Sequence, residues 1–367
     1  MFKRIIILLL LLAILASCTT KKLKRYQKTA YEAGFNTFIS LLGYSDREET
    51  FNDYFKMLDE EFRKYNQYFD IYNNYEGVNN LKTINDNAGI KEVIIDKELF
   101  DFLKFAKSIV KKTSPAFDIS SGALLKLWHD YREDGKSLNE DNLLGDVPSS
   151  EELEIKKQLF SIDKLILDEN KSSAYLSDKE FSLDVGGIAK GYAASKVAEK
   201  LKKAGLKSAA IDAGGNIKLI GSKPDGLWRV GIVNPDASPS AINFDLKEDM
   251  TLVTSGDYQN YYKAKDNKIY HHIIDLNSGY PLDLYHSVSI ITYDSGLADA
   301  LSTSLFNLSI EDGKKLIKQF PDEFIGVVYI SSKPYETDLK SFHTNNYYYY
   351  YSDNLSDLII KKDWLIT

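Results

Sequence analysis

Cysteine, clustered basic charge and long apolar runs are all scarce in this sequence. Its 367 residues include one cysteine, so no disulfide can form within the chain. The formal net charge is −7, and past the first residues a basic cluster occurs only at 21–25. A duplex-binding surface needs a clustered excess of Lys and Arg. We therefore expect no nucleic-acid partner. The one long apolar run covers residues 5–16, whereas a membrane-spanning helix needs roughly 20 residues.

The N-terminus has the features of a secretory signal. Lys3 and Arg4 precede the apolar run, which ends in Leu15-Ala16-Ser17-Cys18. This ending resembles the bacterial lipobox, in which the cysteine is acylated and becomes the first residue of the mature protein. We expect residues 1–17 to be a lipoprotein signal peptide and residues 18–30 a lipidated N-terminus and tether. The protein would then work on the extracytoplasmic face of a membrane. The alternative is an uncleaved anchor with an incidental cysteine.

The rest of the sequence has the composition of a globular protein. Apolar residues make up 44% and charged residues 27%, both ordinary values. Past residue 30 there is no Pro/Gly/Ser-rich linker and no repeat. We expect one domain over residues 31–355 and a C-terminal tail at 356–367. Short strand-like runs mixed with helices favour an α+β fold over a doubly wound sheet.

Hydrophobic spacing and end signals predict the individual elements. A helix should start at Ser45, where Ser45 and Glu48 have the form of a capping box, and its apolar stripe reaches Phe69. Further helices are expected at 96–111, 187–203, 295–307 and 310–319. Strands are expected at 164–168, 173–177, 181–185, 208–212, 216–220, 228–233, 251–255, 269–275, 287–292 and 324–330. The tyrosine-rich segment 345–354 predicts a last strand.

A double glycine precedes one of these helices. Asp184 ends a predicted strand, and Gly186 and Gly187 lead into the helix. Backbone N–H groups at such a helix N-terminus can bind a phosphate, and Lys190 lies one turn further on, where it could pair with the charge. The same residues also suit a tight structural turn. They match neither the dinucleotide-binding glycine pattern nor a P-loop.

Two further groups of residues are candidates for chemistry. Asp299 and Thr303 lie four apart on a predicted helix, so both side chains point the same way. A carboxylate and a hydroxyl suit Mg²⁺, which takes few protein ligands and adds water and substrate phosphate; a solvent-facing Asp and a packed Thr are the alternative. His271 and His272 adjoin in a predicted strand, so at most one can face a given pocket. Imidazole is well suited to accept a hydroxyl proton.

Taken together, six segments resemble, in order, the ApbE family of FAD:protein FMN transferases. They follow an early Phe35-Asn36-Thr37 and read FDISSGALLKLW, SLDVGGIAKGYA, IDAGGNIKL, VTSGDYQNYY, HHIIDLNSGYPL and SVSIITYDSGLADALSTSLF. The resemblance implies a bilobal, T-fold-like single domain of mixed antiparallel sheets and flanking helices. FAD would lie between the lobes, with Mg²⁺ at its pyrophosphate.

The resemblance also assigns roles to residues. Asp299 and Thr303 would bind the metal through their side chains, and Gly187 through its carbonyl. His272 aligns with the family's histidine before Ile-Ile-Asp and would be the catalytic base. The residues expected to line the FAD site are Phe35, Tyr72, Asp118, Ile119, Ser120, Asp184, Lys190 and Ile273. The usual proline after Ile-Ile-Asp is Leu276 here, a change that removes no functional group.

The activity implied by this resemblance is covalent flavinylation. FMN would pass from FAD to a threonine hydroxyl of an exported acceptor protein, and AMP would leave. The family's acceptor motif, broadly Asp-(Gly/Ser)-x-x-(Ser/Thr)-(Ala/Gly/Ser)-Thr, is absent from this chain. One alternative uses the same site with water as acceptor, which makes an FAD pyrophosphatase. An alternative of another class is a non-catalytic FAD-binding or carrier lipoprotein, which would have no use for a metal and a base.

Overall fold

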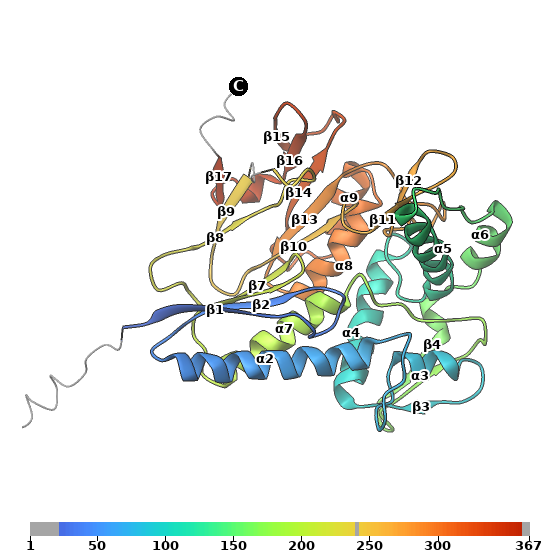
Figure 1. Cartoon of the computed structure of the whole chain (residues 1–367), viewed down its shortest axis with the longest axis horizontal. Helices are drawn as coiled ribbons and strands as arrows, with labels where there is room; N and C mark the ends of the chain where they lie inside the picture. The colour runs from blue at the N-terminus through green and yellow to red at the C-terminus, as the bar shows by residue number, and fades with distance from the viewer. Residues whose placement is uncertain (1–21, 239–241, 362–367) are drawn as a thin grey trace, which may run out of the picture.

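An antiparallel sheet of nine strands runs through the centre of the molecule (Figure 1). The computed structural model describes residues 22–238 and 242–361, and the sheet is counted within them. Its strands, in spatial order, are β1 (Lys24–Ala30), β2 (Ile39–Ser45), β6 (Ala209–Ala213), β7 (Asn216–Ile220), β10 (Thr251–Gly256), β13 (Ser287–Thr292), β14 (Gly326–Ser331), β16 (Tyr348–Tyr351) and β15 (Lys340–His343). Every neighbouring pair is antiparallel.

Helices cover one face of this sheet. They are α2 (Glu48–Phe69), α4 (Lys97–Thr113), α7 (Ala189–Lys203) and α8 (Ser295–Phe306). Figure 1 shows α2 and α7 lying along the same side of the sheet, where they contact each other. Helix α7 packs on α8 and β7, and α8 also packs on β10 and β13. Helix α8 is buried on all sides except near Thr303, so it forms the centre of the main hydrophobic core.

The other face of the sheet is covered by a small antiparallel sheet. Its strands are β8 (Trp228–Gly231), β9 (Ile242–Leu246) and β17 (Ile359–Lys361). The alternation of β16 explains the run of tyrosines in the sequence. Tyr349 and Tyr351 point into the core beneath the small sheet, whereas Tyr350 belongs to the main core.

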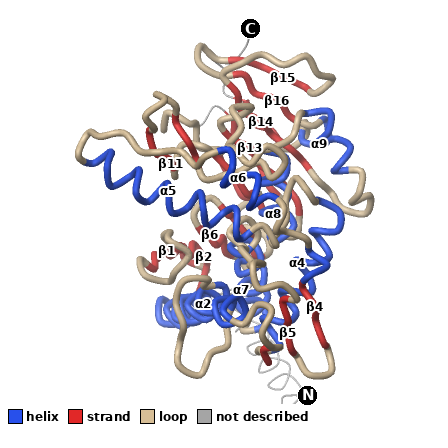
Figure 2. Tube along the Cα trace, turned by 90° about the vertical axis from the view of Figure 1, so that its right-hand side faces the viewer, coloured by secondary structure: helices blue, strands red, loops and turns tan. Residues whose placement is uncertain are grey.

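A third group of elements extends beside the sheet. Helices α5 (Gly122–Glu140) and α6 (Ser150–Lys157) pack there with the hairpin of β11 (Tyr261–Lys263) and β12 (Ile269–His271). Figure 2 shows α5 and β11 side by side. Trp128 of α5 stacks on Tyr270 at a ring distance of 5.4 Å, within a separate apolar cluster. The remaining elements are α3 (Leu81–Asp86), α9 (Ile310–Ile317), β3 (Val93–Ile94), β4 (Leu165–Asp168) and β5 (Ser173–Leu176).

The α+β prediction is confirmed, and most predicted elements lie within a few residues of their expected places. Several expectations about single segments differ from the structure, including the strand expected at 269–275, which ends at His271. Ser45 does not cap α2, because it ends β2 opposite Lys24 and Arg47 takes the cap position without a side-chain bond. Residues 181–185 form no strand, only a bridge from Ser182 to Ser121. Residues 24–30 of the expected tether form β1, and β17 lies inside the expected tail.

The predicted signal peptide and Cys18 lie outside the described residues. Within the described part of the chain, no helix is both long enough and apolar enough to cross a membrane.

Candidate functional site

The N-terminal turn of α7 and the middle of α8 meet closely, and three predicted residues lie at this junction. The backbone N–H of Gly191 donates to Asp299 Oδ2 at 2.9 Å. A Cβ on Gly191 would lie 2.0 Å from the carbonyl oxygen of Ser295, so no larger residue fits without moving a helix. A Cβ on Gly187 would lie 3.0 Å from Thr303 Oγ1. Glycine therefore brings the backbone of 187 beside the Thr303 hydroxyl, and the backbone of 191 beside the Asp299 carboxylate.

The side chains around this junction are a set of oxygen donors. Asn216, on β7, donates through Nδ2 to Asp299 Oδ1 at 3.4 Å, and its own buried Oδ1 has no hydrogen-bond partner. Ser255 Oγ lies 3.4 Å from Thr303 Oγ1. An unsatisfied buried oxygen is costly, and it is explained if a cation or its water fills the space. Hard cations such as Mg²⁺ prefer this donor set.

No richer metal site competes with this junction. Across residues 22–238 and 242–361, no group of three or more His, Cys, Asp or Glu side chains could hold a metal. Zinc or iron sites need such groups. The junction residues fit a cation that takes few protein ligands and completes its shell with water and phosphate.

The predicted residues 118–120 lie against the segment that leads into α7. Asp118 is buried and accepts from the backbone N–H and hydroxyl of Ser120, at 2.9 and 2.6 Å, while burial raises the pKa of its carboxyl. The N–H of Asp184 donates to the carbonyl of Ile119 at 2.8 Å. Gly122 N–H also donates to the carbonyl of Ser182 at 3.1 Å. These hydrogen bonds join the segments 118–122 and 182–184 side by side, although they lie about 65 residues apart in sequence.

The two adjacent histidines point in opposite directions. His271 is buried, its Nε2 lies 3.1 Å from the carbonyl oxygen of Leu282, and its ring packs edge-on against Phe306. Ile273 is buried too, and its N–H donates to His271 Nδ1 at 3.2 Å. His272 faces the other way and is exposed. Strand β12 ends at His271 and His272 lies in the bend after it, so the exposed His272 is the histidine available to a ligand.

His272 lies in a recess rather than on an open surface. Exclusion of water by the surrounding protein, followed by the positive charges of Arg132 and Lys190, lowers its pKa to about 3. The half-buried Asp184 lies in the same recess, and there burial raises the pKa of its carboxyl. Arg132 acts on both His272 and Asp184, and Lys190 of α7 acts on His272. We use the word recess for the surroundings of these four residues.

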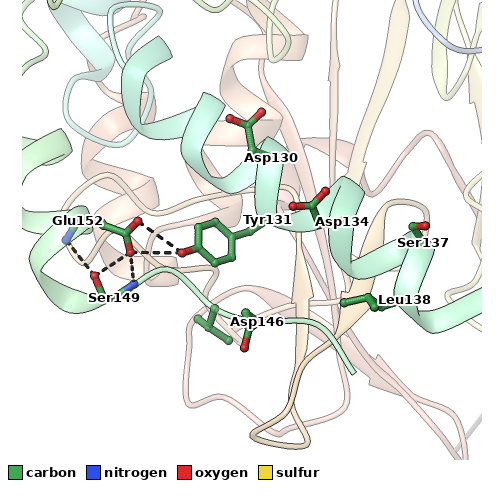
Figure 3. A pocket seen from close by; sticks show the side chains of 9 residues that line it. Asp130, Tyr131, Asp134, Ser137, Leu138, Asp146, Ser149 and Glu152 are labelled. Atoms are coloured by element: carbon green, nitrogen blue, oxygen red, sulfur yellow. Dashed lines mark hydrogen bonds between the residues drawn. The ribbon is translucent and has the colours of Figure 1, made fainter. Parts of the chain in front are cut away.

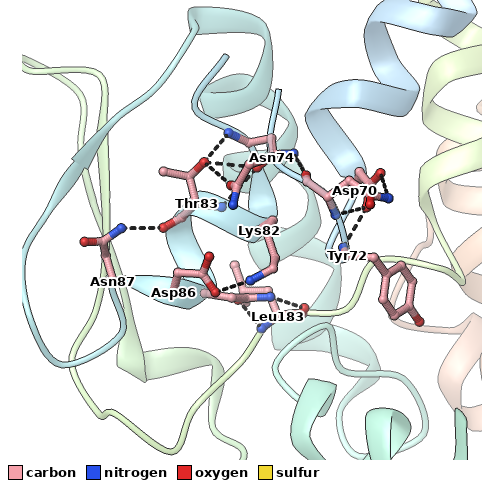
Figure 4. Close-up of polar contacts among 11 residues, drawn as sticks. Asp70, Tyr72, Asn74, Lys82, Thr83, Asp86, Asn87 and Leu183 are labelled. Carbon is pink, nitrogen blue, oxygen red and sulfur yellow. Dashed lines mark hydrogen bonds and ion pairs between the residues drawn. The ribbon is translucent and has the colours of Figure 1, made fainter. Parts of the chain in front are cut away.

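Tyr72 lies at the rim of this recess, on a loop that Asp70 organises (Figure 4). Asp70 accepts the N–H groups of Tyr72 and Asn73 at 2.6 and 2.9 Å and the Tyr75 hydroxyl at 2.7 Å. Tyr72 is 49% exposed and lies against His129, with 4.9 Å between ring centroids. Burial and the charge of Asp184 raise the Tyr72 pKa to about 12. The phenol thus stays neutral and offers an aromatic face near Asp184.

Phe35 lies against α2, and no contact links it to the recess residues within the described chain. Its φ of 58° places it in the left-handed region, held by a bond from its N–H to Asn66 Oδ1 at 2.8 Å. The ring packs edge-on against Phe62 and Phe69 of α2. The same loop carries Thr37, whose hydroxyl would lie 2.2 Å from a Cβ on Gly214. The loop of Phe35 is therefore fixed against the double glycine of segment 212–216.

A family model confirms what this arrangement and the motifs indicate. The ApbE family model matches residues 35–327. The chain belongs to the ApbE family. Among curated relatives, the FAD:protein FMN transferase of Klebsiella pneumoniae (strain 342) is 32% identical over 263 residues, 71% of this chain and 78% of the relative. That of Treponema pallidum (strain Nichols) is 31% identical over 258 residues, 66% of this chain and 68% of the relative.

Solved structures of ApbE proteins share the fold. The ApbE protein of Thermotoga maritima superposes with a TM-score of 0.70 at 28% identity, over 83% of this chain and 94% of that one. The flavin transferase ApbE of Vibrio cholerae gives a TM-score of 0.71 at 22% identity, over 91% of this chain and all of its own length. The order of motifs along this chain thus corresponds to the ApbE fold.

The candidate site contains residues that the sequence did not single out. Arg132 acts on His272 and Asp184, and His129 acts on Asp184; both residues lie on α5. Burial raises the pKa of Asp212, which also accepts from the N–H of Gly215 at 3.2 Å. Asn216 touches Asp299. The IDAGGN motif contains Asp212 and Asn216, but nothing in the spacing of α5 signals that Arg132 is buried.

A hollow of about 780 Å³ beside α5 is not this site (Figure 3). Its lining includes the carboxylates of Asp130, Asp134, Asp146 and Glu152. Glu152 is engaged with Tyr131 and Ser149. So many acidic groups would repel the phosphates of a dinucleotide. The recess at His272, with its two cations, is the better match for an ApbE substrate.

Proposed function

We propose that this chain is a Mg²⁺-dependent FAD:protein FMN transferase. It would transfer the FMN half of FAD to a threonine hydroxyl of an exported acceptor protein and release AMP. The observation that carries the proposal is the meeting of Asp299, Thr303 and the backbone of Gly187 near a recess that holds a neutral histidine and a lysine. The names of the relatives support the same activity.

The junction residues would hold the metal. Gly187 would give its carbonyl, and Asp299 and Thr303 their side-chain oxygens, with the Gly191 N–H fixing the carboxylate. When bound, Mg²⁺ neutralises pyrophosphate charge and so stabilises the transition state of phosphoryl transfer. Lys190, in the first turn of α7, would add a second positive charge for the phosphates.

His272 is the residue we assign as base. It would take the proton of the threonine hydroxyl as that oxygen bonds to the flavin-side phosphorus. The bond from this phosphorus to the bridging oxygen breaks, and AMP leaves with that oxygen. With a pKa of about 3 the imidazole is unprotonated at neutral pH and free to accept. Bound phosphates would raise this pKa, since an opposite charge favours the imidazolium, which moves it towards the range in which a base works best.

The walls of the recess would hold the rest of FAD. Asp118, Ile119, Ser120, Asp184 and Ile273 line or support one side of the recess. Tyr72, on the rim, and Phe35 are assigned to the flavin end. Tyr72 offers a 49% exposed ring for stacking. Phe35 would act mainly through its loop, because its ring packs on α2.

The place of action is part of the proposal. Acylation of Cys18 would attach the enzyme to the extracytoplasmic face of a membrane, as a lipoprotein. Covalent attachment of flavin is useful there, because a cofactor that dissociates from an exported protein is lost. The partners would be FAD and an exported acceptor that carries a threonine flavinylation motif.

A second candidate uses water in place of the acceptor hydroxyl. The observation that favours it is the exposure of the His272 side chain, which leaves room for a single water molecule in the place of the acceptor hydroxyl. The enzyme would then be an FAD pyrophosphatase that yields FMN and AMP. The two activities share every residue named above and differ in what occupies the mouth of the recess.

The deciding experiment uses the soluble chain from Thr19 onward with FAD, Mg²⁺ and a small protein that bears the acceptor motif. We expect a fluorescent acceptor band on a denaturing gel, with one AMP released per flavin attached. Asp299→Ala should abolish both. His272→Ala should reduce turnover roughly 10²–10⁴-fold with little effect on FAD binding, whereas His343→Ala, an exposed histidine far along the chain, should have no effect.

Other outcomes select the alternatives. AMP and free FMN without a labelled band would establish the pyrophosphatase. FAD that is bound but intact would leave a carrier. Full activity of Asp299→Ala at limiting Mg²⁺ would refute the metal site at α7 and α8.

A further inference from the structure

Arg132 is a buried cation, and its neighbouring residues supply too few hydrogen-bond acceptors for its guanidinium. It lies on α5 and is 9% exposed. Its Nη2 is 3.1 Å from His129 Nδ1, and its Nε lies 3.6 Å from a Glu133 carboxylate oxygen, which is beyond a hydrogen bond. Nε is buried and has no hydrogen-bond partner. A guanidinium has five N–H donors, and burying a charge with so few acceptors is costly.

The charge of Arg132 reaches His272 as well as its own neighbour Glu133. The other groups that feel it include Asp184, Tyr72, His129 and Tyr262. Lys190 also acts on His272. Lys190 comes from α7 and Arg132 from α5, so the charges of two separate helices act on the base.

A phosphate placed for attack at His272 would lie within reach of the guanidinium charge, which acts on that imidazole. The hydroxyl that loses its proton to His272 bonds to phosphorus at the same moment, so the reacting phosphate lies within a few ångströms of the imidazole. We propose that Arg132 binds the phosphate that is transferred with the flavin through its guanidinium, whose buried Nε has no hydrogen-bond partner in the protein. This inference rests on the proposed function and adds a residue to it.

The chemistry of arginine suits this task. Its planar fork matches the oxygens of a phosphate and stays charged at every working pH. Negative charge builds on the phosphoryl oxygens in the transition state, and a fixed donor there stabilises it more than the ground state. With Lys190 and the metal ligands on the α7 side, Arg132 would hold the opposite side of the same group.

Arg132 also keeps the base unprotonated before the substrate arrives. The groups that act on the His272 imidazole are Arg132 from α5, Lys190 from α7, the neighbouring His271 and a backbone bond to Asn260. Removal of the Arg132 charge takes away one cause of the low pKa, so the pKa of His272 rises. The rate would then fall at a higher pH when the solution is acidified.

The test compares Arg132→Gln, Arg132→Lys and Glu133→Gln in the soluble chain from Thr19. Glu133→Gln is the matched control, because it removes the local ion pair but keeps the guanidinium, and Glu133 is not among the charges that act on His272. We expect Arg132→Gln to lower kcat roughly 100-fold, with a smaller loss of FAD affinity measured by flavin fluorescence quenching. The acid limb of the rate should move to higher pH. Arg132→Lys should recover part of the rate and the original acid limb.

Several results would overturn the inference. In one, Arg132→Gln keeps kcat within about threefold of the parent and leaves the acid limb unchanged. In a second, the variant changes only the KM of the acceptor, which would assign Arg132 to the acceptor protein instead. In a third, Glu133→Gln shows the same loss as Arg132→Gln, which would make the role structural. If Arg132→Gln does not fold, Arg132→Lys and its pH profile decide.

This test also separates the inference from the proposed function. If the unchanged chain releases no AMP from FAD, the proposed function fails. In that case the affinity for FAD still decides about Arg132: weaker binding in Arg132→Gln than in Glu133→Gln supports a phosphate contact, and equal binding removes it.

Discussion

Replacing Gly191 by alanine should separate the two helices that build the candidate metal site. A Cβ at this position would lie 2.0 Å from the Ser295 carbonyl oxygen and 2.7 Å from Asp299 Cβ. Ordinary contact begins at 3.4 Å, so the helices must move apart by 3.4 − 2.0 = 1.4 Å. Both obstacles are close to the backbone of α8 and cannot rotate away. The movement also lengthens the 2.9 Å bond from the Gly191 N–H to Asp299 Oδ2.

Three contributions set the magnitude. Overpacking costs about 1–3 kcal/mol, and loss of a hydrogen bond to a carboxylate costs about 1.5–3 kcal/mol. Alanine gains about 1 kcal/mol over glycine in a helix. The net loss of unfolding free energy is roughly 1.5–5 kcal/mol, a fall of about 2–7 °C in Tm for a chain of this length. We expect calorimetry to show this fall and the Mg²⁺ needed for half-maximal flavin transfer to rise at least about tenfold, because Asp299 loses its orientation.

Gly296→Ala is the matched control. It lies in the first turn of α8, where a Cβ would meet the tip of the Phe105 ring at 3.0 Å. A ring tip can give way, and the helix propensity gain offsets the contact, so the change should stay within about 1 kcal/mol. If Gly191→Ala were as stable as the parent and kept its Mg²⁺ requirement, the close approach of α7 and α8 would have no bearing on the site.

Two further predictions concern residues around the recess. His286 Nδ1 lies 2.9 Å from Asp257 Oδ2, and this bond raises the pKa of His286. The resulting stabilisation is complete below the pKa of the unfolded state and is lost as pH rises through the pKa of the folded state. His286→Gln should therefore lower Tm more at about pH 6 than at about pH 9, and an equal loss at both would refute the ion pair. Although burial alone would raise it, bonds from Tyr75 and its neighbours lower the pKa of Asp70. Asp70→Ala should free the Tyr72 loop, cost about 1–3 kcal/mol and weaken FAD binding, whereas unchanged quenching of flavin fluorescence would show that the loop has no part in binding.

The sequence predicted elements well where local pattern and tertiary contacts agree. The stripe that ends at Phe69 predicted α2 because those aromatics pack on the core. Ser45 failed as a cap because sheet pairing with β1 fixes its backbone first. Residues 24–30 read as a tether because β1 is an edge strand whose side chains are mostly exposed, so its pairing left no apolar signal.

The candidate site likewise contains residues that the sequence predicted and residues that it did not. Helical spacing predicted that Asp299 and Thr303 point the same way, and Thr303 does lie close to the backbone of Gly187. The sequence also indicated that only one of the two histidines can face a ligand, although the strand that should contain both ends at His271. Arg132 could not be predicted, because it lies in the polar run HDYRED and is buried only through the packing of α5 on the β11 hairpin. Such a burial depends on residues some 130 positions away.

The pairing of β1 also limits how far the enzyme can reach. Since Lys24 already belongs to the sheet, only residues 19–23 separate Cys18 from the folded domain. Six residue steps span at most about 20–22 Å when fully extended. If Cys18 is acylated as we propose, Lys24 at the start of β1 would therefore stay within that distance of the membrane surface. An acceptor protein whose threonine lies far from the membrane would have to bend towards the membrane surface, or carry its motif on a segment long enough to reach the enzyme there.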